Sequence, residues 1–194
     1  MTRHLFTDAI LETDRLRIRP YKLEDVNDLH RAVSGPTFYD YIPGETTPSL
    51  MEVENIIKWS ISCCQKNTIE KIYKFNLGIT LKETQEFIGF CGLGPYDLDP
   101  KQIELYYGIS EKFTGQGLAT EAARAVLQFG FDELQLDEIV TTVHPQNLAS
   151  RRILEKVGFH YKLTLKNLTE NDRAFEGYDY YAITKKSFKQ LLKL

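Results

Sequence analysis

The segment that most constrains the fold is a glycine-rich turn that reads Lys112-Phe113-Thr114-Gly115-Gln116-Gly117-Leu118-Ala119-Thr120. A strand-like apolar run precedes it at 103–110, and an amphipathic run typical of a helix follows it at 117–134. The two glycines allow the backbone to approach a ligand closely. The first N–H groups of a helix have no partner within the helix and favour an anion. We therefore expect a strand–turn–helix unit that binds a diphosphate group.

Other phosphate-binding motifs fit this turn less well. A Walker loop requires a lysine directly after its last glycine, where Leu118 follows Gly117. A Rossmann turn requires a third small residue, where Thr120 stands, and an acid at the end of the next strand. Asp137 precedes the predicted strand at 139–143 and so lies at the wrong end. A turn that needs glycine only for its flexibility remains the alternative.

Length and composition indicate one ordinary globular domain over residues 1–194. The chain is 42% hydrophobic and 26% charged, with a formal net charge of −3. This balance argues against nucleic acid as the main partner. The apolar runs are too short to span a membrane, and the start Met1–Asp8 is too polar for a secretory signal. Three cysteines without metal-ligand spacing favour a reducing compartment, so we expect a cytoplasmic protein.

Apolar periodicity predicts a mixed α/β fold in which an antiparallel front half meets a parallel βαβ half. A polar turn is expected at 94–100, and a loop with aromatic content at 34–49. The predicted strands cover 10–19, 73–81, 86–93, 103–110, 139–143, 159–165 and 178–184, and the predicted helices cover 23–33, 49–66, 117–134, 147–157 and 185–194.

Several segments in order resemble the GNAT N-acetyltransferase superfamily, in particular its RimJ/RimL-like branch of ribosomal-protein N-terminal acetyltransferases. Leu11–Pro20 is similar to the strand motif TxRLxLRP, and Leu23–Asp25 to the start of the first helix. Phe87–Leu93 resembles IGxxGL. Ile103–Ser110 and Gly115–Ala122 together resemble GYWL…GKGYATEA, and Asn147–Phe159 resembles NxxSxxxxEKxGF.

The resemblance implies a GNAT-type mixed, mostly antiparallel seven-stranded sheet that is splayed at the centre and flanked by helices. It implies that acetyl-coenzyme A, the co-substrate, lies in the split without any metal. Its pantetheine arm would satisfy the unpaired backbone groups of the exposed strand edge. The cofactor-binding residues implied are Tyr107, Ile109, Ser110, Lys112, Gly115, Gln116, Gly117, Leu118, Ala119, Thr120 and Asn147. A homodimer is common in such branches, although the sequence shows no interface.

Two residues depart from the family pattern. Lys112 begins the loop where Gln or Arg is usual, and a lysine can still face phosphate as a point charge. Leu154 stands where many superfamily members place a tyrosine general acid, so that route is closed here.

Glu104 and Ser150 are the catalytic candidates. Glu104 lies on the strand beside the expected split and could accept the ammonium proton, directly or through a water, if burial raises its pKa. A glutamate on the wet face of a strand is the alternative. Ser150, one turn into its helix, could donate a proton to the thiolate, or could be a surface serine bonded to a carbonyl. Asn147 is expected to cap that helix and could also bind the pantetheine.

Other residues are assigned mainly structural roles. His144 is expected to be structural or solvated. Tyr106 and Tyr107 alternate in direction, so one should pack in the core while the other lines the split. The loop Phe38–Ile42 could form an amine-binding wall or pack in the core. The cysteines Cys63, Cys64 and Cys91 are expected to be buried thiols, not nucleophiles.

The sequence therefore predicts direct transfer of an acetyl group to a primary amine in a ternary complex. The acceptor is a protein N-terminus or a small-molecule amine. The alternative is a module that senses acyl-coenzyme A without catalysis, which would need neither Glu104 nor Ser150.

Overall fold

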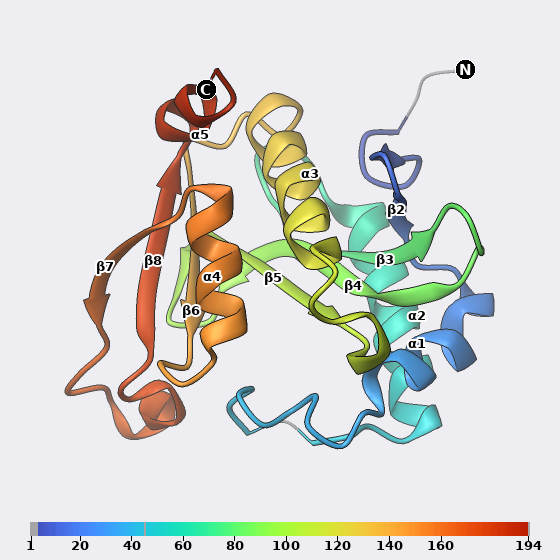
Figure 1. Cartoon of the computed structure of the whole chain (residues 1–194), viewed down its shortest axis with the longest axis horizontal. Coiled ribbons are helices and arrows are strands. Elements are labelled where there is room, and N and C mark those ends of the chain that lie inside the picture. Colours follow the sequence, from blue (N-terminus) through green and yellow to red (C-terminus); the bar gives the residue numbers. More distant parts are fainter. Residues whose placement is uncertain (1–3, 45, 194) are drawn as a thin grey trace.

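The computed structural model describes residues 4–44 and 46–193. Residues 1–3, 45 and 194, which fall within the predicted domain 1–194, lie outside the described residues. A single sheet runs through the structure in the order β1-β2-β3-β4-β5-β6-β8-β7 (Figure 1). Every neighbouring pair is antiparallel except β5 and β6, which are parallel. The expected mixed, mostly antiparallel GNAT-type sheet is confirmed.

The elements have the following bounds. The strands are β1 (Leu11–Glu12), β2 (Leu16–Pro20), β3 (Phe75–Leu81), β4 (Phe87–Tyr96), β5 (Asp99–Ile109), β6 (Glu138–Val143), β7 (His160–Thr164) and β8 (Asp179–Thr184). The α-helices are α1 (Val26–Val33), α2 (Leu50–Lys66), α3 (Leu118–Asp132), α4 (Leu148–Val157) and α5 (Lys185–Leu191), with short 3₁₀ turns at η1 (Leu23–Asp25), η2 (Glu111–Phe113) and η3 (Glu170–Phe175).

The sheet has eight strands instead of seven because the first predicted strand, 10–19, is a small hairpin. Its two arms pair Leu11 with Ile18 and fold back at Thr13. The Thr13 hydroxyl oxygen accepts from the Leu16 amide, and the Thr13 amide donates to the Leu16 carbonyl. A side chain that satisfies backbone groups in this way favours a turn over an extended strand.

The predicted turn at 94–100 is wrong, because β4 and β5 continue through most of it. Only Asp97 and Leu98 form the turn, and Pro95 lies inside β4 opposite Ile103. A proline is tolerated there because the pairing of β3 with β4 ends at Phe75 and Leu93, so the other side of β4 has no neighbouring strand.

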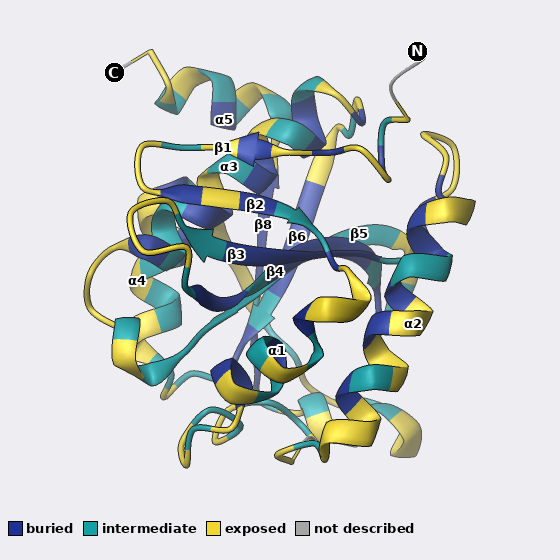
Figure 2. Ribbon diagram, turned by 90° about the vertical axis from the view of Figure 1, so that its right-hand side faces the viewer, coloured by how far each residue is buried: buried dark blue, intermediate teal, exposed yellow. Residues whose placement is uncertain are grey.

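Helices cover both faces of the sheet. Helices α3 and α4 lie in front of it in Figure 1, while Figure 2, which views the sheet along its edge, shows α1 on the opposite side with α2 beside it. The larger core lies under α3, where Ala122, Val126 and Phe131 are buried against strand residues such as Leu105. A second cluster joins α1 and α2 to the other face through Phe87. Amphipathic helix patterns in the sequence correspond to these two layers.

The sheet opens between β5 and β6. Their register contains the single pair Glu104 and Val140. Beyond that pair, β5 continues to Ile109 beside β4, whereas β6 pairs along its length with β8. The two halves of the sheet therefore diverge, and the expected splay at the centre is confirmed.

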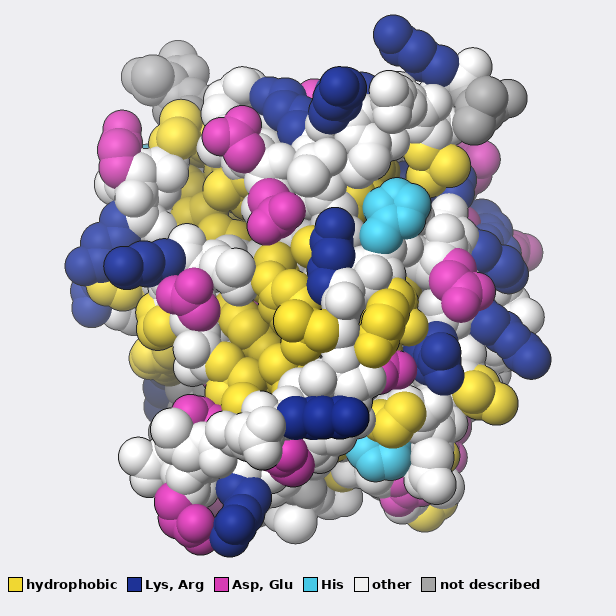
Figure 3. Space-filling model, turned by 90° about the vertical axis from the view of Figure 1, so that its left-hand side faces the viewer, with side chains coloured by type: hydrophobic (Ala, Val, Ile, Leu, Met, Phe, Trp, Pro, Cys, Tyr) yellow, Lys and Arg dark blue, Asp and Glu magenta, His cyan; other side chains and the backbone are white. Residues whose placement is uncertain are grey.

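At the other edge of the sheet, β7 is exposed along most of its length. Tyr161 and Leu163 are among its exposed apolar side chains. Figure 3 faces the side on which β7 and β8 lie in Figure 1, and it shows apolar side chains gathered near the middle with charged ones around them.

None of the helices in the described parts of the chain is both long and apolar enough to cross a membrane.

Candidate active site

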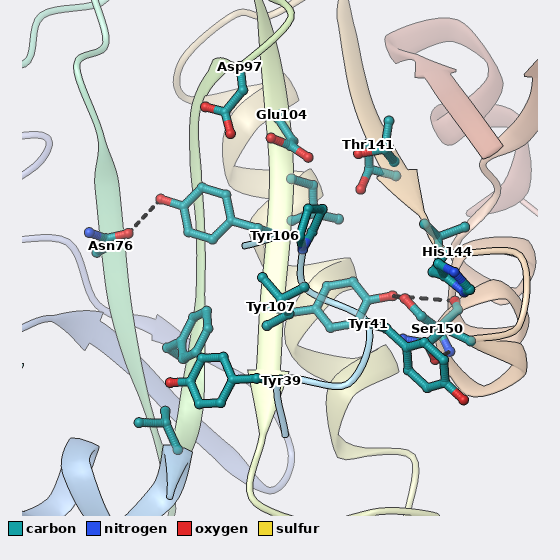
Figure 4. A pocket seen from close by; sticks show the side chains of 18 of the residues that line it. Tyr39, Tyr41, Asn76, Asp97, Glu104, Tyr106, Tyr107, Thr141, His144 and Ser150 are labelled. Carbon is teal, nitrogen blue, oxygen red and sulfur yellow. Dashed lines mark hydrogen bonds between the residues drawn. The ribbon is translucent and has the colours of Figure 1, made fainter. Parts of the chain in front are cut away.

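A cavity of about 420 Å³ lies at the split between β5 and β6. Its walls come from β3 to β6, from the start of α4, and from the loop that joins α1 to α2. Figure 4 shows Glu104 and Asp97 toward one end and the pair formed by Tyr107 and Ser150 farther along. The site is thus assembled from segments that are far apart in the sequence.

The predicted diphosphate turn leads directly into α3. Gly115 and Gly117 have φ angles of 74° and 77°, which a residue with a side chain rarely adopts. No atom lies within 4 Å of the position that a Cβ of Gly115 would take. Gly117 is the N-cap of α3, so the amides of Leu118, Ala119 and Thr120 lack partners within the helix. The turn has the open backbone and the helix dipole that a diphosphate requires.

An arginine that the sequence reading did not single out holds this turn in place. The Arg15 Nη1 donates to the Gln116 carbonyl at 2.9 Å, while its Nε donates to Glu121 at 2.7 Å. Glu121 also accepts from Thr13 and from the Arg15 amide. Burial alone would raise the pKa of Glu121, but these bonds outweigh it and lower the pKa. Arg15 therefore orients the turn and compensates a negative charge in the first turn of α3.

Two predicted cofactor residues use their polar groups elsewhere. The Lys112 ammonium forms a 2.8 Å ion pair with Glu86 and lies over the Phe113 ring. The Ser110 amide donates to the Ile88 carbonyl at 2.8 Å, which ties it to β4. Any contact of either residue with phosphate or pantetheine stays a prediction.

The exposed edge of β5 is formed by residues that alternate with Ser110. Backbone groups of successive strand residues point to opposite sides, so those of Ile109 and Tyr107 face away from β4. Beyond Glu104 no register pair joins β5 to β6, and this side of Ile109 and Tyr107 opens onto the split. An amide-bearing arm can pair there as an additional strand would.

Glu104 is partly buried in the cavity wall. Burial raises its pKa to about 7, the charge of Lys74 lowers it, Asp97 raises it, and a backbone hydrogen bond from Thr142 lowers it. A carboxyl group with a pKa near neutrality is suited to accept a proton and release it again. The condition stated for Glu104 as a base, a pKa raised by burial, is met.

Ser150 and Tyr107 form a hydroxyl pair on the other side of β5. Their oxygens are 2.8 Å apart. Burial raises the pKa of Tyr107, so its hydroxyl stays protonated at neutral pH. Asn147 caps α4 by accepting from the Ser150 amide at 3.0 Å, which confirms the predicted cap. Leu154 is buried in the core, away from the cavity walls.

The two candidate groups approach the split from opposite faces of the sheet. Glu104 and Tyr106 are two residues apart on β5 and share one face, whereas Tyr107 points to the face covered by α3 and α4. Tyr106 donates to Asn76 at 2.7 Å, and Tyr107 contacts Ser150. Both tyrosines line the cavity, where only one was expected to do so.

The aromatic loop packs partly in the core and lines the cavity, while its role as an amine-binding wall stays a prediction. Phe38 packs against Phe90, with ring centroids 6.1 Å apart, in the cluster below α1 and α2. Tyr39 and Tyr41 line the cavity, as Figure 4 shows. The loop is held by Glu111, which accepts from the amide and the hydroxyl of Thr37.

His144 lies between two tyrosine rings and also lines the cavity, so its expected structural role stays a prediction. Its ring lies 5.3 Å from Tyr41 and 5.1 Å from Tyr178. The three cysteines are buried and unpaired, as expected, and burial raises the pKa of Cys64 to about 12. In the described part of the chain no three His, Cys, Asp or Glu side chains are grouped closely enough to hold a metal ion.

Comparison with known proteins places the chain among acetyltransferases. Residues 15–160 match the acetyltransferase (GNAT) domain family. YkkB of Bacillus subtilis (strain 168) is 32% identical over 173 residues, which cover 88% of this chain and 96% of YkkB. A GNAT-family acetyltransferase structure from Bacillus anthracis has a TM-score of 0.73 and 27% identity, over 92% of this chain and 99% of that one.

The fold also matches the branch named from the sequence. RimJ from Mycobacterium smegmatis, solved in complex with CoA-disulfide, has a TM-score of 0.75 and 24% identity, over 92% of this chain and 88% of that one. The RimJ/RimL-like resemblance is therefore confirmed at the level of the fold.

Proposed function

The chain belongs to the GNAT acetyltransferase family, and from this premise we propose that it transfers an acetyl group from acetyl-coenzyme A to a primary amine. The proposal rests on the groups that line the split between β5 and β6. A carboxyl group with a pKa of about 7 and a hydroxyl pair share one cavity, and a glycine-rich helix start follows the same strand.

The residues of the split fit the parts of acetyl-coenzyme A. Its diphosphate would be held by the amides that begin α3, with Gly115 and Gly117 providing the close approach. Its pantetheine amides would pair with the edge of β5 at Tyr107 and Ile109. The Asn147 side-chain oxygen is used by the helix cap, so its NH₂ group is the part left for pantetheine.

Two residues of this chain are assigned proton transfers. Acetyl-coenzyme A supplies the acetyl thioester when it is bound. Glu104 accepts the ammonium proton of the acceptor, directly or through a water, and the neutral nitrogen then forms the new N–C bond. As the C–S bond breaks, Ser150 Oγ donates its proton to sulfur and recovers one from the nitrogen. Glu104 returns its proton to solvent. The acetyl group passes directly to the amine without residing on the enzyme.

The acceptor is assigned to amines as a class, either a protein N-terminus or a small molecule. The aromatic cavity wall around Tyr39 and Tyr41 would surround the approaching amine. We place the reaction in the cytoplasm, in keeping with the sequence, and treat residues 1–194 as one catalytic domain. A non-catalytic sensor of acyl-coenzyme A would keep the phosphate turn but would have no use for Glu104.

Thermal unfolding with separate ligands tests the binding step. At a hundredfold excess over its dissociation constant, a ligand specific for the folded state adds about 2.7 kcal/mol of stability. We expect this effect from acetyl-coenzyme A and coenzyme A, and no effect from NAD or ATP. Stabilisation by NAD or ATP alone would overturn the proposal.

The same measurement has a matched pair of variants. Arg15→Gln removes the donor to the Gln116 carbonyl and should reduce the shift produced by acetyl-coenzyme A. Arg17→Gln, two residues farther along in β2, removes an exposed ion pair with Glu12 and should keep the shift. Release of free thiol in the presence of a panel of peptides and small amines then separates an enzyme from a sensor.

The hydroxyl pair predicts non-additive kinetics. Ser150→Ala should lower kcat by about a hundredfold, the lower end of what one positioned proton donor contributes. Tyr107→Phe should lower kcat less, and the double variant should resemble Ser150→Ala, because the hydroxyls share one hydrogen bond. The measurement is kcat at saturating acetyl-coenzyme A for the four proteins.

A hydroxyl pair outside the cavity provides the control. Tyr161 and Thr164 share a 2.9 Å hydrogen bond on the exposed strand β7, so Tyr161→Phe should leave kcat unchanged. Additive effects of Ser150→Ala and Tyr107→Phe would show that the two hydroxyls do not act through their shared hydrogen bond.

A further inference from the structure

The titratable groups around Glu104 come from four neighbouring segments. Lys74 precedes β3, and Asp97 lies in the turn between β4 and β5. Tyr96 of β4 and Tyr106 of β5 complete the titratable groups that interact with it. His144, at the end of β6, lines the same cavity but lies beside Ser150 (Figure 4), and Asp172 and Tyr180 act on Tyr96. Burial raises the pKa of Tyr96 and of Tyr106, so both hydroxyls are neutral at physiological pH. Lys74 is the lysine among these groups, and its positive charge lowers the pKa of Glu104.

A missing side chain creates the place that Lys74 occupies. Gly94 is directly opposite Glu104 in the register of β4 and β5, so the two positions share one face of the sheet. A Cβ added to Gly94 would lie 2.5 Å from Lys74 Cδ and 3.4 Å from Lys74 Nζ. The lysine therefore fills the space beside Glu104 that any residue other than glycine would take.

The position of Lys74 is fixed from two directions. Its Nζ lies 4.3 Å from the centre of the Tyr106 ring, a cation–π contact. The Tyr106 hydroxyl is held by Asn76, which is itself bonded to Ser60. The Lys74 carbonyl accepts from the buried side chain of Asn67 at 2.9 Å. Among the described residues no carboxylate forms an ion pair with Lys74, so its charge acts on the cavity at longer range.

Asp97 acts on the same carboxyl group with the opposite sign. It lines the cavity near Glu104, as Figure 4 shows, but it is exposed to solvent. Water screens an exposed charge more than a partly buried one, so its effect should be weaker than that of Lys74.

We propose that Lys74 is a positioning residue for the base of this enzyme: its ammonium, set in the space left by Gly94, keeps Glu104 in the proton-accepting form, and Asp97 opposes it. This proposal rests on the proposed function for its catalytic meaning, but the interaction of the charges does not depend on turnover. A lysine that served only to cover the Tyr106 ring would leave the ionisation of Glu104 unchanged when replaced.

The test is the titration of Glu104 in the full chain, followed by the ¹³C signal of labelled glutamate carboxyls and assigned with Glu104→Gln. Lys74→Met should raise the midpoint by about one pH unit, the lower end of the effect of a nearby opposite charge. Lys74→Arg should restore the wild-type midpoint, and Asp97→Asn should lower it by less than a unit. Lys71→Met removes the matching exposed contact with Tyr73 and should have no effect.

Kinetics add a second readout. At a pH well below the Glu104 midpoint, raising that midpoint by about one pH unit should lower kcat/KM of Lys74→Met about tenfold relative to the wild type. At high pH the kcat/KM values of the two proteins should converge. An unchanged Glu104 midpoint in Lys74→Met overturns the proposal. If Lys74→Met does not fold, an unchanged or raised midpoint in Asp97→Asn overturns it instead. Shifted midpoints in a protein that transfers no acetyl group would support the charge pair and refute the proposed function.

Discussion

Glu104→Gln is expected to lower kcat/KM by a factor of about 10²–10⁴, the usual contribution of a positioned general base, while making the protein more stable at pH 8. The loss of activity follows because the amide cannot accept the ammonium proton. In the wild type, kcat/KM should fall about tenfold per pH unit below the Glu104 pKa of about 7.

The gain in stability has a different cause, the cost of keeping a charged carboxylate partly buried. The pKa of Glu104 rises on folding from 4.5 to about 7, so the folded state binds this proton more tightly than the unfolded state. The stability that this proton contributes is complete below pH 4.5 and is lost as the pH rises to about 7, because a charge must then stay partly buried. A glutamine carries no such charge. We expect a gain of about 1 kcal/mol at pH 8, reduced by partial solvent screening, and none at pH 4.

Urea unfolding at the two pH values, together with kcat/KM, checks both expectations. Glu83→Gln is the control, because Glu83 is exposed on the turn between β3 and β4 and should change neither quantity. A Glu104→Gln protein that keeps wild-type kcat/KM would remove Glu104 from the mechanism. One that is less stable than the wild type at pH 8 would show that the carboxylate has a structural partner.

Gly89→Ala is expected to lower the free energy of unfolding by about 3 kcal/mol or more, the range of severe overpacking. Gly89 lies in β4 opposite Ile109 with a φ of 157°. An added Cβ would lie 2.1 Å from the Gly108 carbonyl oxygen and 2.9 Å from Ile109 Cα. Both contacts are with backbone, so no side chain can rotate away to relieve them.

The displaced strand is the one proposed to pair with pantetheine, so Gly89→Ala should also weaken the stabilisation by acetyl-coenzyme A. Gly177→Ala is the matched control: its φ is 84° and nothing lies within 4 Å of the added Cβ, so only backbone strain of about 1 kcal/mol is expected. Urea denaturation measures all three proteins. A Gly89→Ala protein with the wild-type midpoint would show that β4 and β5 separate more easily than their register suggests.

Local sequence patterns correctly predicted those elements that depend on only a few neighbouring residues. The Asn147 cap and the Gly158 end of α4 are each fixed by a few neighbouring residues, and both are confirmed. The first glycine of the IGxxGL motif, Gly89, is explained by the close approach of the β5 backbone. The predicted turn at 94–100 failed because the tolerance for Pro95 depends on where β3 ends, which is a tertiary fact.

Contacts between distant segments were beyond the sequence. Arg15 and Glu121 were both inside recognised motifs, yet nothing local indicates that residues 106 positions apart bond to each other. Lys74 lies outside every motif, and its place beside Glu104 depends on Gly94 and Tyr106. Only a set of related sequences in which such positions vary together could have indicated these contacts.

The bond from Arg15 to the Gln116 carbonyl has a consequence for the amino-terminal hairpin. β1 and β2 contribute nothing to the cavity walls, yet the hairpin turn between them supplies the group that orients the diphosphate turn. Occupancy of that turn and docking of the hairpin are therefore thermodynamically linked, and the coupling is reciprocal. A fusion or truncation that loosens the first strands would register as a loss of cofactor affinity, and a bound cofactor would in turn protect the amino-terminal backbone from exchange with solvent.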